Sequence, residues 1–444
     1  MTQTQSAPPA TVPTAPPPGT TPQAPNARTA GPRGAVAQWF EGTPGRMRAF
    51  LILAAAMSVV FGLAAAQGFS QSDGALDRAQ ANTAQLVRIQ AIHTNLVSAN
   101  ADATNAFLVG GLEPPEQRAH FVNSLAAAAG LIAEAATAQP ADRDVLGALN
   151  KTLITYGGLI EQARANNRQG LPIGSQYLKD ANSVLQDDSL PLVKALVEAN
   201  EKRVDTEFDG ISQGTIWILV GGLLSLVVFA ITLRWLARRT HRYLNVPIVA
   251  GAALVLLTTV VGGVSLASAS NSAKYTRSSE YERTLALSRA RIAAYDARSN
   301  ESLTLIARGS GDAFDKAYNA AATQVNEQLG KVGSSDSGTL TDLWSTYQAV
   351  HKKIRTADGD KGDWEGAVAM AVGKNETSDN SVYAFDAFDS ASNQQLTATS
   401  TAVQKDLKNV RDGLPPIGWL GVPIGILAAL LVAWGMSQRL EEYR

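Results

Sequence analysis

Residues 215–267 read TIWILVGGLLSLVVFAITL-RWLARRTHRYLN-VPIVAGAALVLLTTVVGGVSLA, two apolar runs around a short basic segment. The runs at 215–233 and 246–267 contain no charged residue, whereas the segment between them contains four arginines. A helix needs roughly 17–25 mostly apolar residues to cross about 30 Å of hydrocarbon. The stretch therefore predicts two membrane helices joined by a short basic loop.

Two further uncharged runs, Ala49–Ala66 and Ile417–Met436, have the same character. Four such runs are improbable in a soluble chain. Tryptophans stand near the ends of two runs, where an interfacial belt would place them: Trp217, Trp235, Trp419 and Trp434. The sequence predicts an all-α integral membrane protein with four transmembrane helices.

Arginine placement predicts the orientation, because short basic segments stay in the cytoplasm. Segments 1–48, 234–245 and 437–444 hold ten basic residues and three acidic ones. Segments 68–214 and 271–413 hold 28 basic and 36 acidic residues. We therefore expect a multi-pass protein of the plasma membrane with cytoplasmic N- and C-termini and two extracytoplasmic regions.

The first apolar run has a second interpretation. Residues 63–67, LAAAQ, resemble the small-residue cleavage site of a signal peptide. The preceding 48 residues are much longer than an ordinary signal-peptide start, which favours a retained anchor. Ten of the nineteen prolines lie in residues 1–47, and this composition predicts a disordered tail.

The chain has the pattern of a tandem duplication. The first and third apolar runs, and the second and fourth, are each about 200 residues apart. Landmarks in the outer regions keep an offset of 199: Leu86 and Leu285, Asp102 and Glu301, Gly110 and Gly309. Coincidence between two alanine-rich helical regions is the alternative.

The pattern of each outer region predicts a four-helix bundle, because stretches of helical periodicity alternate with Gly/Pro breaks. The expected helices are 70–109, 116–138, 141–167 and from 173 onward, then 272–308, 312–330, 339–356 and 377–411, with a short extra helix at 364–372. The predicted organisation is tail 1–47, membrane helix 48–67, bundle 68–214, membrane helix 215–233, loop 234–245, membrane helix 246–268, bundle 269–413, membrane helix 416–437 and tail 438–444.

Residues that could carry chemistry are sparse. The chain has no cysteine, and its four histidines form no metal-binding pair. No nucleotide-binding loop or nucleophile motif occurs, so we expect no enzyme, no cofactor and no metal site. His93 falls on an apolar helical stripe beside Asn100. A hydrogen-bonded core histidine is the simpler interpretation, and a ligand contact is the other.

The second outer region begins with an arginine-rich helix. Its guanidinium groups could bind a carboxylate ligand, but acidic residues within helical reach favour a solvated face of mixed ion pairs. The arginines are Arg277, Arg283, Arg289, Arg291 and Arg298.

Small residues mark two membrane runs. Gly421 and Gly425 form a GxxxG pair, and small residues repeat at four-residue steps in the first run: Ala54, Ser58, Gly62 and Ala66. Such faces let membrane helices approach closely. Contact among the chain's own helices is the simpler expectation, and a homodimer contact is the alternative.

Two stretches carry a family resemblance: NAFLVGGLEPPEQRAHF (105–121) and LPIGSQYLKDANSVLQDDSLP (171–191). With the four runs and tiny inner loops, they resemble the GlnX family of actinobacterial membrane proteins. The outer regions are also similar to the four-helix-bundle sensor domains of chemoreceptors. The resemblance implies amino-acid sensing, in which an extracytoplasmic glutamate/aspartate-binding lipoprotein is linked to a cytosolic Ser/Thr kinase, protein kinase G.

Candidate docking residues for the kinase lie in the inner loop: Arg238, Arg239, His241 and Arg242. They join the cytoplasmic ends of two membrane helices that extend from different bundles. Orientation of the chain and contact with anionic membrane lipid are the simpler role for these residues. A direct small-molecule receptor and a structural membrane protein remain the alternative functions. Nothing in the sequence indicates nucleic-acid binding.

Overall fold

The computed structural model describes residues 42–109, 112–240, 245–333, 337–360, 362–373 and 379–441, and these are helical with short connections and no strand. The elements are α2 (Gly42–Val109), α3 (Pro115–Ala138), η1 (Pro140–Asp142), α4 (Arg143–Arg168), α5 (Ile173–Ser183), η2 (Val184–Ser189), α6 (Leu190–Thr240), α7 (Val246–Thr276), η3 (Arg277–Tyr281), α8 (Glu282–Ile306), α9 (Asp312–Val332), α10 (Ser337–Arg355), η4 (Thr356–Asp360), α11 (Trp364–Val372), α12 (Ser381–Asp412) and α13 (Ile417–Glu441).

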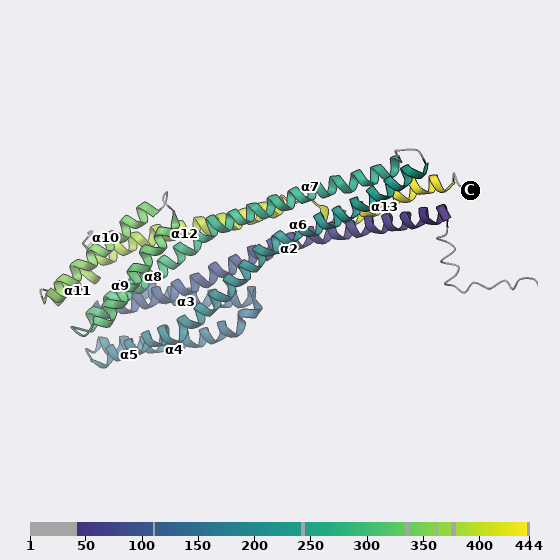
Figure 1. Ribbon diagram of the computed structural model, residues 1–444. Helices are drawn as coiled ribbons and strands as arrows, with labels where there is room; N and C mark the ends of the chain where they lie inside the picture. The colour runs from purple at the N-terminus through teal and green to yellow at the C-terminus, as the bar shows by residue number, and fades with distance from the viewer. Residues whose placement is uncertain are drawn as a thin grey trace, which may run out of the picture.

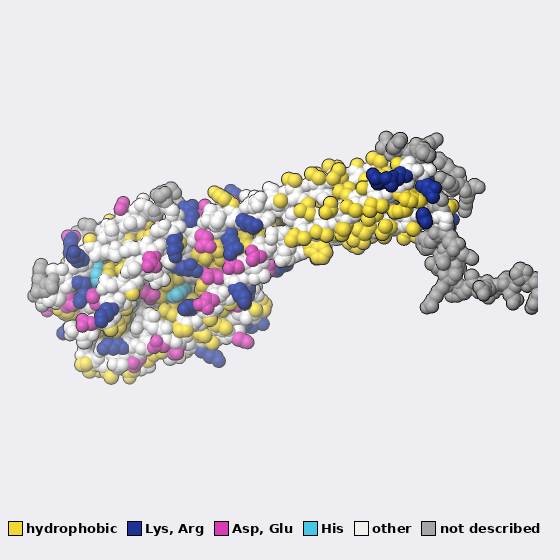
Figure 2. Space-filling model, in the orientation of Figure 1, with side chains coloured by type: hydrophobic (Ala, Val, Ile, Leu, Met, Phe, Trp, Pro, Cys, Tyr) yellow, Lys and Arg dark blue, Asp and Glu magenta, His cyan; other side chains and the backbone are white. Residues whose placement is uncertain are grey.

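The molecule is an elongated rod with an apolar half and a polar half (Figures 1 and 2). Segments of α2, α6, α7 and α13 form the apolar half, where Phe61, Phe229 and Val255 are buried between them. Large apolar side chains also cover the outside of this half, and Leu223 and Leu430 are more than half exposed. A soluble protein rarely exposes so large an apolar surface.

Within the described residues, five helices are long and apolar enough to cross a membrane by length and composition. Four of them contain the four uncharged runs. The fifth is α3, whose Phe121, Ala128 and Ile132 pack into a core in the polar half. Its position separates α3 from the apolar half of the rod (Figure 1).

Backbone contact between α2 and α13 closes the ring of four apolar helices. A Cβ atom at Gly62 would lie 2.6 Å from the Gly421 carbonyl oxygen and 2.9 Å from Gly425 Cα. A Cβ at Gly425 would lie 2.6 Å from the Ser58 carbonyl oxygen. The two small-residue faces therefore meet within one chain, which agrees with the expected contact among the chain's own helices.

A stalk follows the apolar half, in which the four long helical rods continue side by side. Its core contains Leu76 and Leu86 of α2, Phe208 of α6, Tyr281 of η3 and Leu407 of α12. Beyond the stalk the chain divides into two bundles (Figure 1). We call bundle 1 the outer parts of α2 and α6 with α3–α5, and bundle 2 the elements α8–α12.

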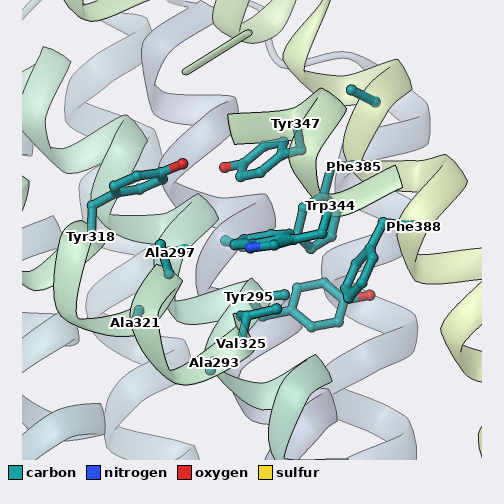
Figure 3. Packing of buried hydrophobic residues seen from close by; sticks show 14 of the residues in the cluster. Ala293, Tyr295, Ala297, Tyr318, Ala321, Val325, Trp344, Tyr347, Phe385 and Phe388 are labelled. Atoms are coloured by element: carbon teal, nitrogen blue, oxygen red, sulfur yellow. The ribbon is translucent and has the colours of Figure 1, made fainter. Parts of the chain in front are cut away.

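Bundle 2 has an aromatic core (Figure 3). Trp344 and Tyr347 stack with ring centroids 5.0 Å apart, and Phe388 packs on Trp344 at 5.3 Å. The Tyr318 and Tyr347 hydroxyls point toward one another in Figure 3. The core of bundle 1 is mainly aliphatic, with Leu149 and Ile160 fully enclosed.

The two bundles share helices. In α2, Ile89 and Leu96 belong to the core of bundle 1, whereas Val97 and Ala101 belong to the core of bundle 2. In α8, Leu303 packs into the core of bundle 1. Both helices are consequently buried on opposite faces, where a separate bundle would bury only one.

The expected helices of the outer regions agree closely with the structure. The extra helix expected at 364–372 is α11, and the expected break at 309–311 separates α8 from α9. Helix α2 begins at Gly42, inside the segment expected to be a tail, and residues 1–41 lie outside the described residues. The three π-helical segments η2, η3 and η4 had no signal in the sequence.

We expect Gly62→Ala to destabilise the folded chain by about 1–3 kcal/mol, because the added methyl forces α2 away from α13. Gly130→Ala in α3 is the matched control, since a Cβ there meets nothing within 4 Å. The control should instead stabilise the folded chain by about 0.4–1 kcal/mol, because alanine reduces the conformational freedom of the unfolded chain. Thermal unfolding of the detergent-purified protein by circular dichroism measures both, and equal shifts would contradict the close contact.

Candidate functional site

A polar seam joins the two bundles between α2 and α8. Three side-chain hydrogen bonds cross it: Gln90 with Ser288 (3.3 Å), Asn100 with Ser299 (2.7 Å), and Asn105 with Ser302. All but Gln90, which is 4% exposed, are at most 3% exposed. Buried polar groups that are satisfied fix one register between packed helices. The seam is therefore a place where sliding of one bundle against the other would break specific bonds.

Asn100 is the centre of the seam. Its Nδ2 donates to Ser299 Oγ and to Asn182 Oδ1, at 2.7 and 3.0 Å. Its Oδ1 accepts from the Tyr156 hydroxyl at 3.3 Å. One amide thus connects α2 with α4 and α5 of bundle 1 and with α8 of bundle 2.

Arg298 is a buried cation on the α8 side of the seam. Its Nη1 lies 3.2 Å from Asp386 Oδ1 of α12, and its guanidinium covers the Phe385 ring at 4.5 Å. The Asn105 amide, oriented with its nitrogen toward Ser302, accepts from Arg298 Nε at 2.9 Å. Burial raises the pKa of Asp102 on α2 to about 6, although the charge of Arg298 opposes this.

Two of the five arginines of the second outer region contradict the solvated face expected for them. Arg291 and Arg298 are 5% and 7% exposed, because α8 lies between the two cores. Arg291 Nη2 pairs with Asp389 at 2.8 Å. The other three follow the expectation of mixed surface pairs: Arg277 with Asp205, Arg283 with Glu280, and Arg289 with Glu201.

Glu301 of α8 has a buried carboxylate that faces other helices of bundle 2. Its Oε2 lies 2.7 Å from His351 Nδ1 of α10, and its Oε1 accepts from Ser381 Oγ of α12 at 2.6 Å. The Tyr318 ring of α9 stacks on His351 with centroids 3.4 Å apart. Glu301 thus ties α10 and α12 to α8, and α9 joins them through the contact of Tyr318 with His351.

A crevice of about 630 Å³ opens beside the seam, between α2, α6, α8 and α9. His93 and Gln90 line it from α2, and the ion pair of Arg289 with Glu201 crosses it. Among the described residues, His93 Nε2 is buried with no hydrogen-bond partner. The expected hydrogen-bonded core histidine is thus wrong for this nitrogen. Burial lowers the pKa of His93 to about 4, so its imidazole is neutral near pH 7.

The arginine loop lies at the opposite end of the rod. Arg238 and Arg239 are exposed in the last turn of α6, and Figure 2 shows basic side chains gathered at this end of the apolar half. His241 and Arg242, the other predicted docking residues, lie outside the described residues. The structure therefore places Arg238 and Arg239 far from the seam, at the far end of continuous helices.

No cluster of metal-binding side chains occurs among the described residues. The buried carboxylate of Glu301 instead pairs with a histidine and a hydroxyl group, and that of Asp142 with Arg203. Sequence reasoning identified His93, Asn100 and the arginine helix, but missed Asn105, Asp386 and His351 as their neighbours. The one sequence feature related to the contact between α2 and α8 was the 199-residue offset between landmarks of the two outer regions.

We expect Asp296→Asn to weaken the pH dependence of stability. Burial raises the pKa of Asp296 to about 7 from 3.8, with Gln186 opposing. The folded chain then holds a proton that the unfolded chain releases, so this group's contribution to stability falls as pH rises between 3.8 and about 7. Asn cannot ionise, so the melting temperature should change less between about pH 5 and about pH 8.

The matched control is Asp188→Asn in η2, where the carboxylate is exposed. It should leave the pH dependence unchanged. Asp102 contributes in the same direction as Asp296, so the variant should reduce the dependence without abolishing it. An identical pH profile in Asp296→Asn and wild type would show that this carboxyl is not held neutral in the folded chain.

Comparison with known proteins bears on bundle 1. Residues 75–209 match the profile of the family described as Actinobacterial sensor domain. No curated protein and no solved structure shows significant similarity to the chain. A sensor domain suggests a sensing or signalling role and a non-catalytic one, and the long apolar helices indicate a membrane protein. The part of the chain that forms bundle 1 is thus similar to the sensor domains of actinobacteria.

Proposed function

We propose that this protein is a transmembrane signal transducer of the GlnX type. It relays the availability of extracellular glutamate or aspartate, through an extracytoplasmic solute-binding lipoprotein, to a cytosolic Ser/Thr kinase. The match of 75–209 to a sensor domain supports the sensing role. The resemblance of 105–121 and 171–191 to the GlnX family supports the choice of ligand and partners.

The observation that carries the proposal is the continuity of α2. This helix runs for 68 residues from Gly42 to Val109, roughly 100 Å at 1.5 Å per residue. One end lies in the seam, where both bundle cores hold it, and the other end lies at the basic end of the apolar half. A shift at the seam would therefore move the inner end of the same rigid element.

In the proposed topology the four apolar segments span the plasma membrane and both termini are cytoplasmic. The apolar surface of one half of the rod supports the spans. Exposed Arg46, Arg234, Arg238 and Arg239 at its end support a cytoplasmic location for that end. The acidic outer half would then face the extracytoplasmic space.

The proposed tandem duplication gains support from the seam. Asn100 and Ser299, which hydrogen-bond across it, are 199 residues apart, equal to the offset of the sequence landmarks. Leu86 and Leu285, one landmark pair, share the core of the stalk. In a duplicated protein with a two-fold arrangement, residues near the axis contact their own counterparts. Such contacts are therefore expected along α2 and α8.

The partners follow from what the chain exposes on each side. On the inner side, the proposed topology places the short basic loop between α6 and α7. The kinase would dock on the loop containing Arg238 and Arg239, with His241 and Arg242. Outside, the lipoprotein would contact the bundles. Contact with membrane lipid and a homodimer belong to the same proposal.

A direct small-molecule receptor is the second candidate function. The crevice beside the seam favours it, because a buried histidine nitrogen with no hydrogen-bond partner in the described part of the chain lines a space between the two bundles. A ligand that filled this space would contact both bundles and bias their relative position. A structural membrane protein, the remaining alternative, would show no ligand-dependent change.

Single cysteines test the topology, because the chain has none of its own. Thr155→Cys on α4 and Ser345→Cys on α10 should react with a membrane-impermeant thiol reagent on intact cells, since both positions are exposed. Ser437→Cys near the end of α13 should react only after the cells are opened. Labelling of position 437 but not 155 on intact cells would reverse the orientation.

Lysine replacement tests the docking loop. Changing Arg238, Arg239 and Arg242 together to Lys keeps the charge but removes the planar guanidinium that pairs with carboxylate or phosphate. We expect membrane insertion to stay normal and the affinity of the kinase for the loop to fall. The affinity falls about tenfold for each 1.4 kcal/mol of binding free energy lost. Phosphorylation of the kinase substrate after glutamate or aspartate addition gives the readout, and Arg46→Lys is the control. Full signalling in the triple variant would make the loop an orientation signal alone.

A further inference from the structure

A second cavity, of about 210 Å³, lies inside bundle 1 at its membrane-distal end. It is enclosed by the end of α2, the start of α3, the end of α4, and α5. Its lining combines apolar side chains, among them Phe107, Ile160 and Leu178, with the charged side chains of Glu113, Arg118, Arg164 and Arg168. This size lies below the roughly 300–1,000 Å³ of sites for drug-sized ligands. The cavity therefore suits a small metabolite.

Arg164 is a buried charged residue of the cavity lining. Its side chain is 9% exposed, and its two Nη atoms each lie 2.9 Å from a carboxylate oxygen, of Glu113 and of Glu161. The guanidinium also covers the Phe121 ring at 4.1 Å. Its Nε is buried and has no hydrogen-bond partner among the described residues. The guanidinium thus contacts two carboxylates and an aromatic ring, while its Nε–H has no acceptor among the described residues.

Ion pairs link most of the charged side chains around the cavity. Glu113 is 13% exposed, and its ion-pair partners among the described residues are Arg164 and Arg118, at 2.9 and 3.7 Å. Arg168 lies exposed at the rim and forms no ion pair with any described residue. Three arginines thus face two carboxylates, Glu113 and Glu161, which leaves one positive charge unmatched.

We propose that this cavity binds a free α-amino acid. The α-carboxylate would pair with the rim guanidinium of Arg168, since arginine binds carboxylates in a bidentate manner. The α-ammonium group would bind Glu113, and the side chain of the ligand would lie along Phe107 and Leu178. The unmatched positive charge favours a ligand with a second anionic group. This inference rests on the proposed sensing role and adds a binding site within the chain itself.

Calorimetric titration of the full-length protein in lipid nanodiscs tests the site. The probes are L-glutamate, glutarate, which lacks the ammonium group, and the α-methyl ester of L-glutamate, which lacks the free α-carboxylate. We expect L-glutamate to bind at least tenfold more tightly than either analogue. Arg168→Gln and Glu113→Gln should each weaken L-glutamate binding at least tenfold.

Matched controls come from the same helices. Arg143→Gln lies at the other end of α4, and Glu116→Gln is exposed in the first turn of α3, outside the cavity lining. Both should bind L-glutamate like the wild type. Ala106→Leu should fill part of the cavity and abolish binding without touching a charge.

Absence of L-glutamate binding to the wild type, or equal binding in Arg168→Gln and wild type, would overturn the inference. Equal binding of glutarate would do the same, because it would show that no ammonium group is recognised. The relay is measured separately, through kinase-substrate phosphorylation. A chain that signals without binding amino acid would refute this site and leave the proposed function standing.

Discussion

Direct backbone contact between α2 and α13 is the constraint on which the rest of the architecture depends. Gly62, Gly421 and Gly425 remove every side-chain atom that would hold the two helices apart. Their approach closes a ring in which α2 also contacts α6, and α7 contacts both α6 and α13. Because the same helices continue into the stalk, the spacing set in the apolar half also sets where the bundles begin. Packing of small residues replaces the hydrophobic effect as the driving force where apolar surface meets lipid.

The seam works by a different physical principle. Its buried charged groups, among them Arg298 and Glu301, gain little net stability, because removing charges from water offsets most of their attraction. They make alternative registers costly, since a slide of one residue would leave a buried charge unpaired. The apolar half therefore holds the helices together, whereas the polar half selects one arrangement. A sensor needs an arrangement that a ligand can bias, and a specific but weakly stabilised interface provides one.

Much of the fold was accessible from the sequence, and most of the site was not. The apolar helical stripe that includes His93 predicted a buried face on α2, and Ile89 and Leu96 are buried there. Breaks such as 309–311 predicted the helix ends. Periodicity describes one buried face, so it missed Val97 and Ala101 on the opposite face. It also assigned Arg291 and Arg298 to solvent, because charge patterns on a central helix look like those on a surface helix. Partners such as His351 lie some fifty residues from Glu301, and no local pattern connects them.

The order of the helices along the chain has a consequence for biogenesis. Helix α13 leaves the ribosome long after α2, the first described helix, yet it supplies half of the contact with α2. Until α13 arrives, the small-residue face at Ser58 and Gly62 has no partner within the chain. Two growing chains side by side could pair through this face, or one chain could accept α13 from its neighbour. An exchanged pair of chains would carry the same contacts as two separate ones, so the timing of synthesis would decide between them.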